Sequence, residues 1–63
     1  MNNNLMNFRG ERTQSEMAKQ YEVTQQMWSL WERGKSFPKP DIMKKIARDA
    51  ESTVDAIFFM QFM

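Results

Sequence analysis

The most restrictive feature of this sequence is a pair of helix start signals placed close together. Thr13 and Glu16 form the Thr-x-x-Glu pattern of a capping box, in which each side chain accepts a hydrogen bond from the other residue's backbone amide. Thr24 is a second candidate N-cap. The residues from Tyr21 to Thr24 therefore join the two predicted helices, and a joint of this length is typical of a helix-turn-helix.

The rest of the chain also predicts short helices, because apolar residues recur at helical spacing and no segment alternates with the two-residue period of a strand. We expect an all-α fold of five short helices in a single domain over residues 1–63. Besides the helices capped by Thr13 and Thr24, we expect one over about residues 4–10, one that begins at Pro40, and one over about residues 53–62 that is capped by Thr53.

The apolar stripes predict the buried side of each helix. The third helix has Trp28 and Trp31 on one side, with Met27 beside them. A tryptophan stripe at helical spacing is far more often core than a base-stacking surface. The other expected core residues are Leu5, Phe8, Met17, Ala18, Tyr21, Met43, Ile46, Ala47, Ala50, Val54, Ile57 and Phe58.

Cysteine and histidine are both absent, so the chain has neither a disulfide framework nor the usual zinc ligands. Its carboxylates, lysines and hydroxyls are scattered, and we expect no catalytic residue, no metal site, no cofactor and no enzymatic activity. The N-terminal segment lacks the pattern of a signal peptide, and no run approaches about 20 apolar residues. We therefore expect a cytoplasmic protein with no membrane contact and no evident small-molecule ligand.

The net charge is only +1, but the charges are unevenly distributed. Between residues 33 and 48 a single acid, Asp41, stands among six bases, which are Arg33, Lys35, Lys39, Lys44, Lys45 and Arg48. From Asp49 onward there are three acids and no base. The basic run could attract phosphate. The alternative is an ordinary solvated helix face.

Residues 13–35 and 37–58 resemble the Cro and phage-repressor family of helix-turn-helix DNA-binding regulators from bacteria and phages. The matching positions are Thr13-Gln14, Ala18, Thr24-Gln25-Gln26, Trp31 to Lys35, Pro38, Ile46-Ala47, Thr53 and Asp55. The resemblance implies a lambda-repressor-like fold with the helix-turn-helix at about residues 14–33. It also implies sequence-specific binding of double-stranded DNA by a transcriptional regulator, most often a repressor.

Two positions depart from the family pattern. Glu22, in the turn between the second and third helices, and Glu51, after the fourth, stand where the family usually has glycine. If the backbone keeps a positive φ there, each glutamate carries a strain of roughly 1 kcal/mol.

In the family's docking mode the third helix lies in the major groove with its first residues against base edges. The resemblance therefore implies base reading by Gln25, Gln26, Ser29 and Leu30, and phosphate contacts from Gln14, Arg33, Lys35, Ser36 and Lys39. A glutamine amide presents a donor and an acceptor side by side, which matches the N6 and N7 groups of adenine. For the two glutamines the alternative is ordinary solvated surface, which is also the expectation for Lys44, Lys45 and Arg48.

The family often joins its first and third helices through an arginine and a glutamate. The resemblance thus implies a contact between Arg9 and Glu32, for which the alternative is two solvated charges.

The sequence also predicts a partner chain. If the last helix continues from Thr53, then Phe59, Phe62 and Met63 project to a side that no other helix covers, and clustered exposed aromatic residues mark an interface. The family binds paired half-sites of an operator as a two-fold homodimer, and these three residues could form its interface. Alternatively, this tail folds back on Leu5 and Met6, or frays.

A competing function is binding of a protein, as in an antitoxin or antirepressor with the same fold. The basic run over residues 33–39 beside two glutamines favours DNA.

Overall fold

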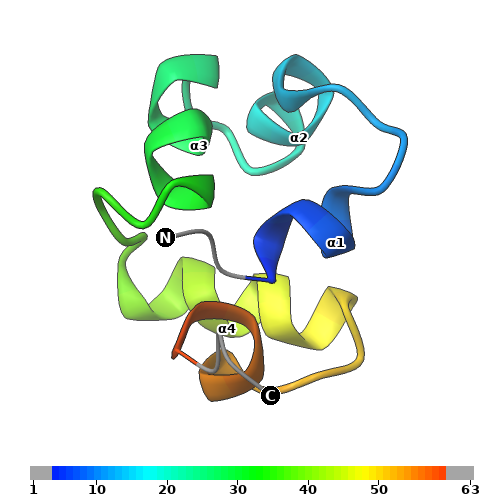
Figure 1. Cartoon of the computed structure of the whole chain (residues 1–63), viewed down its shortest axis with the longest axis vertical. Helices are drawn as coiled ribbons and strands as arrows, with labels where there is room; N and C mark the ends of the chain where they lie inside the picture. The colour runs from blue at the N-terminus through cyan, green and yellow to red at the C-terminus, as the bar shows by residue number, and fades with distance from the viewer. Residues whose placement is uncertain (1–3, 60–63) are drawn as a thin grey trace.

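Five helices make up the part of the chain that the computed structural model describes, residues 4–59, and no strand occurs in that range. They are α1 (Leu5–Arg9), α2 (Gln14–Gln20), α3 (Gln25–Glu32), α4 (Pro40–Asp49) and the π-helix η1 (Asp55–Phe59). The predicted all-α class is confirmed. Figure 1 shows α2 and α3 side by side at one end of the molecule, with α4 and η1 at the other. Among the described residues, no helix has the length and apolar character needed to cross a membrane.

The predicted helix starts are present. Thr13 and Glu16 form the complete capping box, with the Glu16 amide 3.0 Å from Thr13 Oγ1 and the Thr13 amide 2.8 Å from Glu16 Oε1. These hydrogen bonds with Thr13 lower the pKa of Glu16. Thr24 Oγ1 accepts a hydrogen bond from the Met27 amide at 3.1 Å, and Thr53 Oγ1 caps the last turn in the same way. Three threonines thus satisfy backbone donors that a helix start would leave unpaired.

Glu22 and Glu51 both adopt the left-handed backbone conformation, with φ of 59° and 54°. Each closes a Schellman turn, because the amide of the following residue bonds back across the helix end, from Val23 to the Ala18 carbonyl and from Ser52 to the Ala47 carbonyl. The two positions therefore have the geometry that glycine suits best, which is the condition under which strain is expected for both glutamates.

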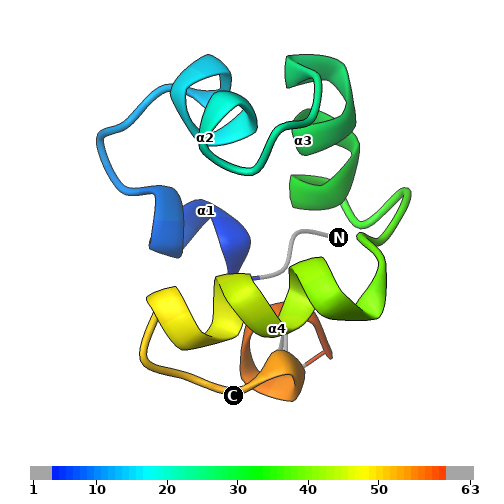
Figure 2. The same ribbon diagram turned by 180° about the vertical axis from the view of Figure 1, so that it is seen from behind.

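A single hydrophobic core lies between the helices. Leu5, Met17, Trp28, Ile46 and Phe58 are its largest fully buried side chains. Ala18, Trp31, Ala47 and Ile57 are also buried in the core, and partly buried residues packed around them include Phe8, Tyr21, Met43, Ala50 and Val54. Seen from behind in Figure 2, α4 passes beneath α1 and in front of η1. The core predicted from the apolar stripes is confirmed except for Met27.

The C-terminal helix differs from the sequence expectation. We expected one regular helix over about residues 53–62, whereas Asp55–Phe59 forms a π-helix and residues 60–62 lie outside the described range. The Ala56 and Ile57 carbonyls accept hydrogen bonds from the side chain and backbone of Asn4, at 2.6 and 2.9 Å. Asn4, the residue before α1, therefore donates hydrogen bonds to two carbonyls of η1, while the Ile57 and Phe58 side chains lie in the core.

Candidate nucleic-acid interface

Helix α3 has one buried side and an exposed first turn. Trp28 and Trp31 are 0% and 3% exposed, which confirms their predicted place in the core. The Tyr21 ring stacks on Trp28 with ring centroids 5.7 Å apart. Gln25 and Gln26 follow the Thr24 cap directly, and both are exposed. The first turn of α3 thus exposes two glutamine side chains, while two tryptophans of the same helix pack in the core.

The prediction that Met27 lies on the buried side of α3 is wrong, because Met27 is 41% exposed. The cause is Glu32, which is only 2% exposed and so belongs to the buried side. At about 100° per residue, including Glu32 moves the centre of the buried side toward Trp28 and leaves Met27 at its edge. Sequence periodicity alone assigns glutamate to the solvent side, so it could not show this rotation.

Glu32 is buried because its carboxylate accepts hydrogen bonds from three side chains. Arg9 Nε and Trp28 Nε1 each lie 2.6 Å from Oε2, while Gln14 Nε2 lies 3.0 Å and Arg9 Nη2 3.4 Å from Oε1. Burial by itself would raise the pKa of Glu32, but the hydrogen bonds from Arg9, Gln14 and Trp28 outweigh it and lower the pKa. The predicted contact between Arg9 and Glu32 is confirmed as an ion pair.

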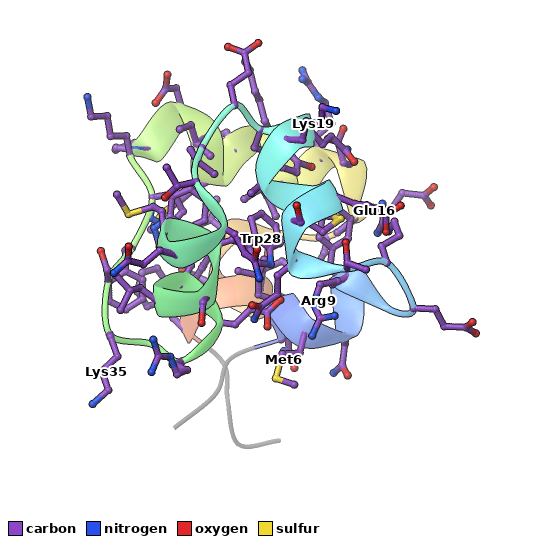
Figure 3. All side chains as sticks on the ribbon, turned by 90° about the horizontal axis from the view of Figure 1, so that it is seen from above. Met6, Arg9, Glu16, Lys19, Trp28 and Lys35 are labelled. Carbon is purple, nitrogen blue, oxygen red and sulfur yellow. The ribbon has the colours of Figure 1, made fainter. Side chains whose placement is uncertain are left out.

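This set of contacts, which we call the Glu32 network, connects three helices through Glu32, Arg9, Gln14 and Trp28. Arg9 comes from α1, Gln14 from α2 and Trp28 from α3. Arg9 also donates to the Arg12 carbonyl at 2.8 Å, which extends the network into the loop before α2. In Figure 3, Arg9 lies below α2 and Trp28 lies between α2 and α3. Sequence reasoning found Arg9 and Glu32 but missed the roles of Gln14 and Trp28, for which no local pattern exists.

The other predicted base-reading and phosphate-binding residues lie on α3 and on the segment that follows it. Ser29 and Leu30 are half-buried, one turn after the glutamines. Arg33, Lys35 and Lys39 are exposed, and Ser36 is half-buried. Gly34, with φ of 71°, turns the chain after α3, and Lys35 projects away from the body of the molecule in Figure 3.

The basic residues of α4 have acidic neighbours, unlike those of the segment from Arg33 to Lys39. Lys44, Lys45 and Arg48 are exposed on α4, as expected for a solvated face. Lys45 and Arg48 line a cleft of about 380 Å³ together with Asp41 and Asp49 of the same helix, so acids accompany the bases there. The bases on the segment from Arg33 to Lys39 have no acidic residue among them.

Two aromatic rings, Phe37 from the segment between α3 and α4 and Phe59 from η1, form an exposed apolar patch. Phe59, predicted as an interface residue, is 53% exposed, and its ring centroid lies 5.4 Å from that of Phe37, which is 46% exposed. Phe62 and Met63, the other two predicted interface residues, lie outside the described residues. Sequence reasoning missed Phe37, because nothing in the turn between α3 and α4 indicated that it would meet the last helix.

Within residues 4–59 the acidic residues form no group that could hold a metal ion. Comparison of the chain with family models, with curated proteins and with solved structures found no match.

Proposed function

We propose that this chain is a sequence-specific double-stranded DNA-binding protein of the phage or bacterial repressor type, with α2 and α3 as its helix-turn-helix. The observation that carries the proposal is the first turn of α3, where Gln25 and Gln26 are exposed while Trp28 and Trp31 anchor the same helix in the core. A helix held in this way can enter a major groove without losing its packing.

The chemistry of the exposed groups supports this function. Each glutamine amide can make a bidentate pair with adenine, which discriminates between bases by about 1–3 kcal/mol. Ser29 offers a hydroxyl to either kind of base edge, and Leu30 an apolar contact to a thymine methyl group. Arg33, Lys35, Ser36 and Lys39 follow α3 in the chain, and with Gln14 they would hold the DNA backbone and so set the register.

The experiment is a selection of bound sites from random duplex DNA, followed by titration of a selected site at several salt concentrations. Gln25→Ala and Gln26→Ala are expected to relax base preference at one or two positions. Lys35→Ala is expected to weaken all sequences alike and to reduce the slope of log K against log salt by about 0.9. Lys44→Ala, an exposed lysine on α4, is the matched control and should leave the slope unchanged. A parent protein that binds no duplex at low salt would contradict the proposal.

The proposed regulator acts as a homodimer on paired half-sites, and the patch formed by Phe37 and Phe59 supports this part of the proposal. Two adjacent half-exposed rings cost free energy in water that a partner chain would recover. Sedimentation equilibrium should show a dimer for the parent and a weaker dimer for Phe59→Ser. Met6→Ser is the control, because Met6 is an exposed apolar residue of α1. Equal dimerisation of the parent and Phe59→Ser would place the interface elsewhere.

A further inference from the structure

The Glu32 network contains a buried acceptor that faces a residue predicted to touch DNA. Glu32 is only 2% exposed, whereas Gln14 is half-buried. The Gln14 Nε2 atom lies 3.0 Å from Glu32 Oε1, and the side chain of Gln14 makes no other hydrogen bond within residues 4–59. The Gln14 amide is therefore held at one point, with the rest of its hydrogen-bonding capacity unused.

The Glu32 carboxylate determines the orientation of the Gln14 amide group. An ionised carboxylate can only accept hydrogen bonds, while a primary amide carries one oxygen and an NH₂ group with two hydrogens. Glu32 must therefore face the NH₂ group, which uses one of these hydrogens and leaves the second. A glutamine on an open surface would turn freely between its two orientations, and a phosphate would accept from only one of them.

We propose that Glu32 is a positioning residue for binding of the DNA backbone, an inference that rests on the proposed function. Glu32 fixes the Gln14 amide so that its second N–H meets a phosphate oxygen. Because Glu32 is also the last residue of α3, the same carboxylate links this phosphate contact to the helix proposed to enter the major groove. Arg9 and Trp28 hold the carboxylate in place through bonds of 2.6 Å to its other oxygen.

The first test needs no DNA and uses the side-chain amide resonances of the ¹⁵N-labelled protein. One Gln14 amide proton is expected downfield of those of the exposed glutamines Gln20, Gln25 and Gln26, because it bonds to a charged acceptor. The shift should disappear in Glu32→Gln, together with that of the Trp28 indole proton. Gln14 amide protons that coincide with those of the exposed glutamines would overturn the proposal.

The second test compares DNA affinities of the parent, Glu32→Gln, Gln14→Ala and the double variant. We expect each single variant to lose about tenfold in affinity on every sequence, as for one hydrogen bond to a charged group, and the double variant to lose no more. The salt slope of Gln14→Ala should equal that of the parent, because Gln14 carries no charge. A purely electrostatic role makes the opposite prediction, since removal of the negative charge of Glu32 would strengthen binding to DNA.

Circular dichroism establishes that each variant is folded. If Glu32→Gln unfolds, Glu32→Asp replaces it, because aspartate keeps the charge opposite Arg9 but is one methylene shorter. Additive losses in the double variant, or tighter binding by Glu32→Gln, would overturn this inference while leaving the proposed function intact. A parent that binds no duplex would instead overturn the function itself.

Discussion

The corner formed by α2 and α3 and the C-terminal segment over residues 53–59 are both anchored in the core, but they are held differently. In the corner, Trp28 and Trp31 are buried and polar groups fix the geometry as well, through the capping box of Thr13 and the Glu32 network. In the C-terminal segment, Ile57 and Phe58 are equally buried, and hydrogen bonds from Asn4 and the Thr53 cap hold the backbone. No buried carboxylate joins side chains from several helices over residues 53–59, and the adjacent Phe59 is left 53% exposed.

This difference shows what each kind of interaction contributes. Apolar burial is non-directional, so it can hold a segment without fixing how the segment is oriented. Hydrogen bonds to a buried carboxylate require particular donors at particular distances, and a misplaced donor leaves the carboxylate unsatisfied at a high cost. The corner is therefore the part of this molecule suited to presenting side chains in a fixed register.

The largest expected effect tests whether the apolar parts of the two regions are equivalent. Trp31→Ala in the corner and Phe58→Ala in the C-terminal segment should each lower the free energy of unfolding by about 3–5 kcal/mol, because each empties the place of a large buried aromatic ring. That is most of the stability expected of so small a domain. Urea unfolding followed by circular dichroism measures both, with the exposed residue Met27 changed to alanine as the control.

Near-parental stability of Trp31→Ala, with only DNA affinity lost, would contradict its place in the core. A much smaller cost for Phe58→Ala than for Trp31→Ala would show that the C-terminal segment contributes little to folding.

The second prediction concerns the pH dependence of stability that Glu32 gives to the corner. The folded pKa of Glu32 is lowered because hydrogen bonds from Arg9, Gln14 and Trp28 outweigh the effect of burial, so folding favours the ionised form. The resulting stability is fully present above the unfolded pKa of about 4.3 and is lost as pH falls through the folded value. Stability of the parent should therefore fall on acidification below about pH 4.3.

Glu32→Gln should show a shallower loss of stability over the same acid range, because glutamine does not titrate. Glu11→Gln, which removes an exposed glutamate, is the matched control and should follow the parent. Thermal unfolding between about pH 3 and about pH 7, monitored by circular dichroism, gives the comparison, because this range covers the titration of a carboxyl group. Parallel curves for the parent and Glu32→Gln would show that the Glu32 network contributes no pH-dependent stability.

Local signals made most of the corner predictable from sequence. Thr13 and Glu16 specify a helix start within four residues, and the spacing of Trp28 and Trp31 gives the buried side of α3. The family resemblance implied the contact between Arg9 and Glu32, but the burial of Glu32 was not predicted, because it depends on donors from three helices that no local pattern brings together. The ring contact between Phe37 and Phe59 joins segments far apart in the chain, and periodicity carries no information about such pairs.

The π-helix was missed for a related reason. A regular helix and a π-helix place Ile57 and Phe58 on nearly the same side, so the apolar pattern fits both. The hydrogen bonds from Asn4 to two carbonyls of η1 are tertiary, and the one to Ala56 joins residues 52 positions apart.

The smallest expected effect concerns two turns, one at Glu22 between α2 and α3 within the corner and one at Glu51 before the C-terminal segment. Both residues have positive φ in the same Schellman geometry, where a Cβ atom is strained and glycine is not. Glu22→Gly and Glu51→Gly should each raise the free energy of unfolding by up to about 1 kcal/mol, less the entropy that glycine adds to the unfolded chain. Glu22→Ala and Glu51→Ala are the matched controls, because alanine removes the charge but keeps the Cβ atom. Urea unfolding should show a gain for the glycine variants alone and of similar size in both turns. A gain in the alanine variants equal to that in the glycine variants would show that charge, and not backbone strain, sets the cost of the glutamates.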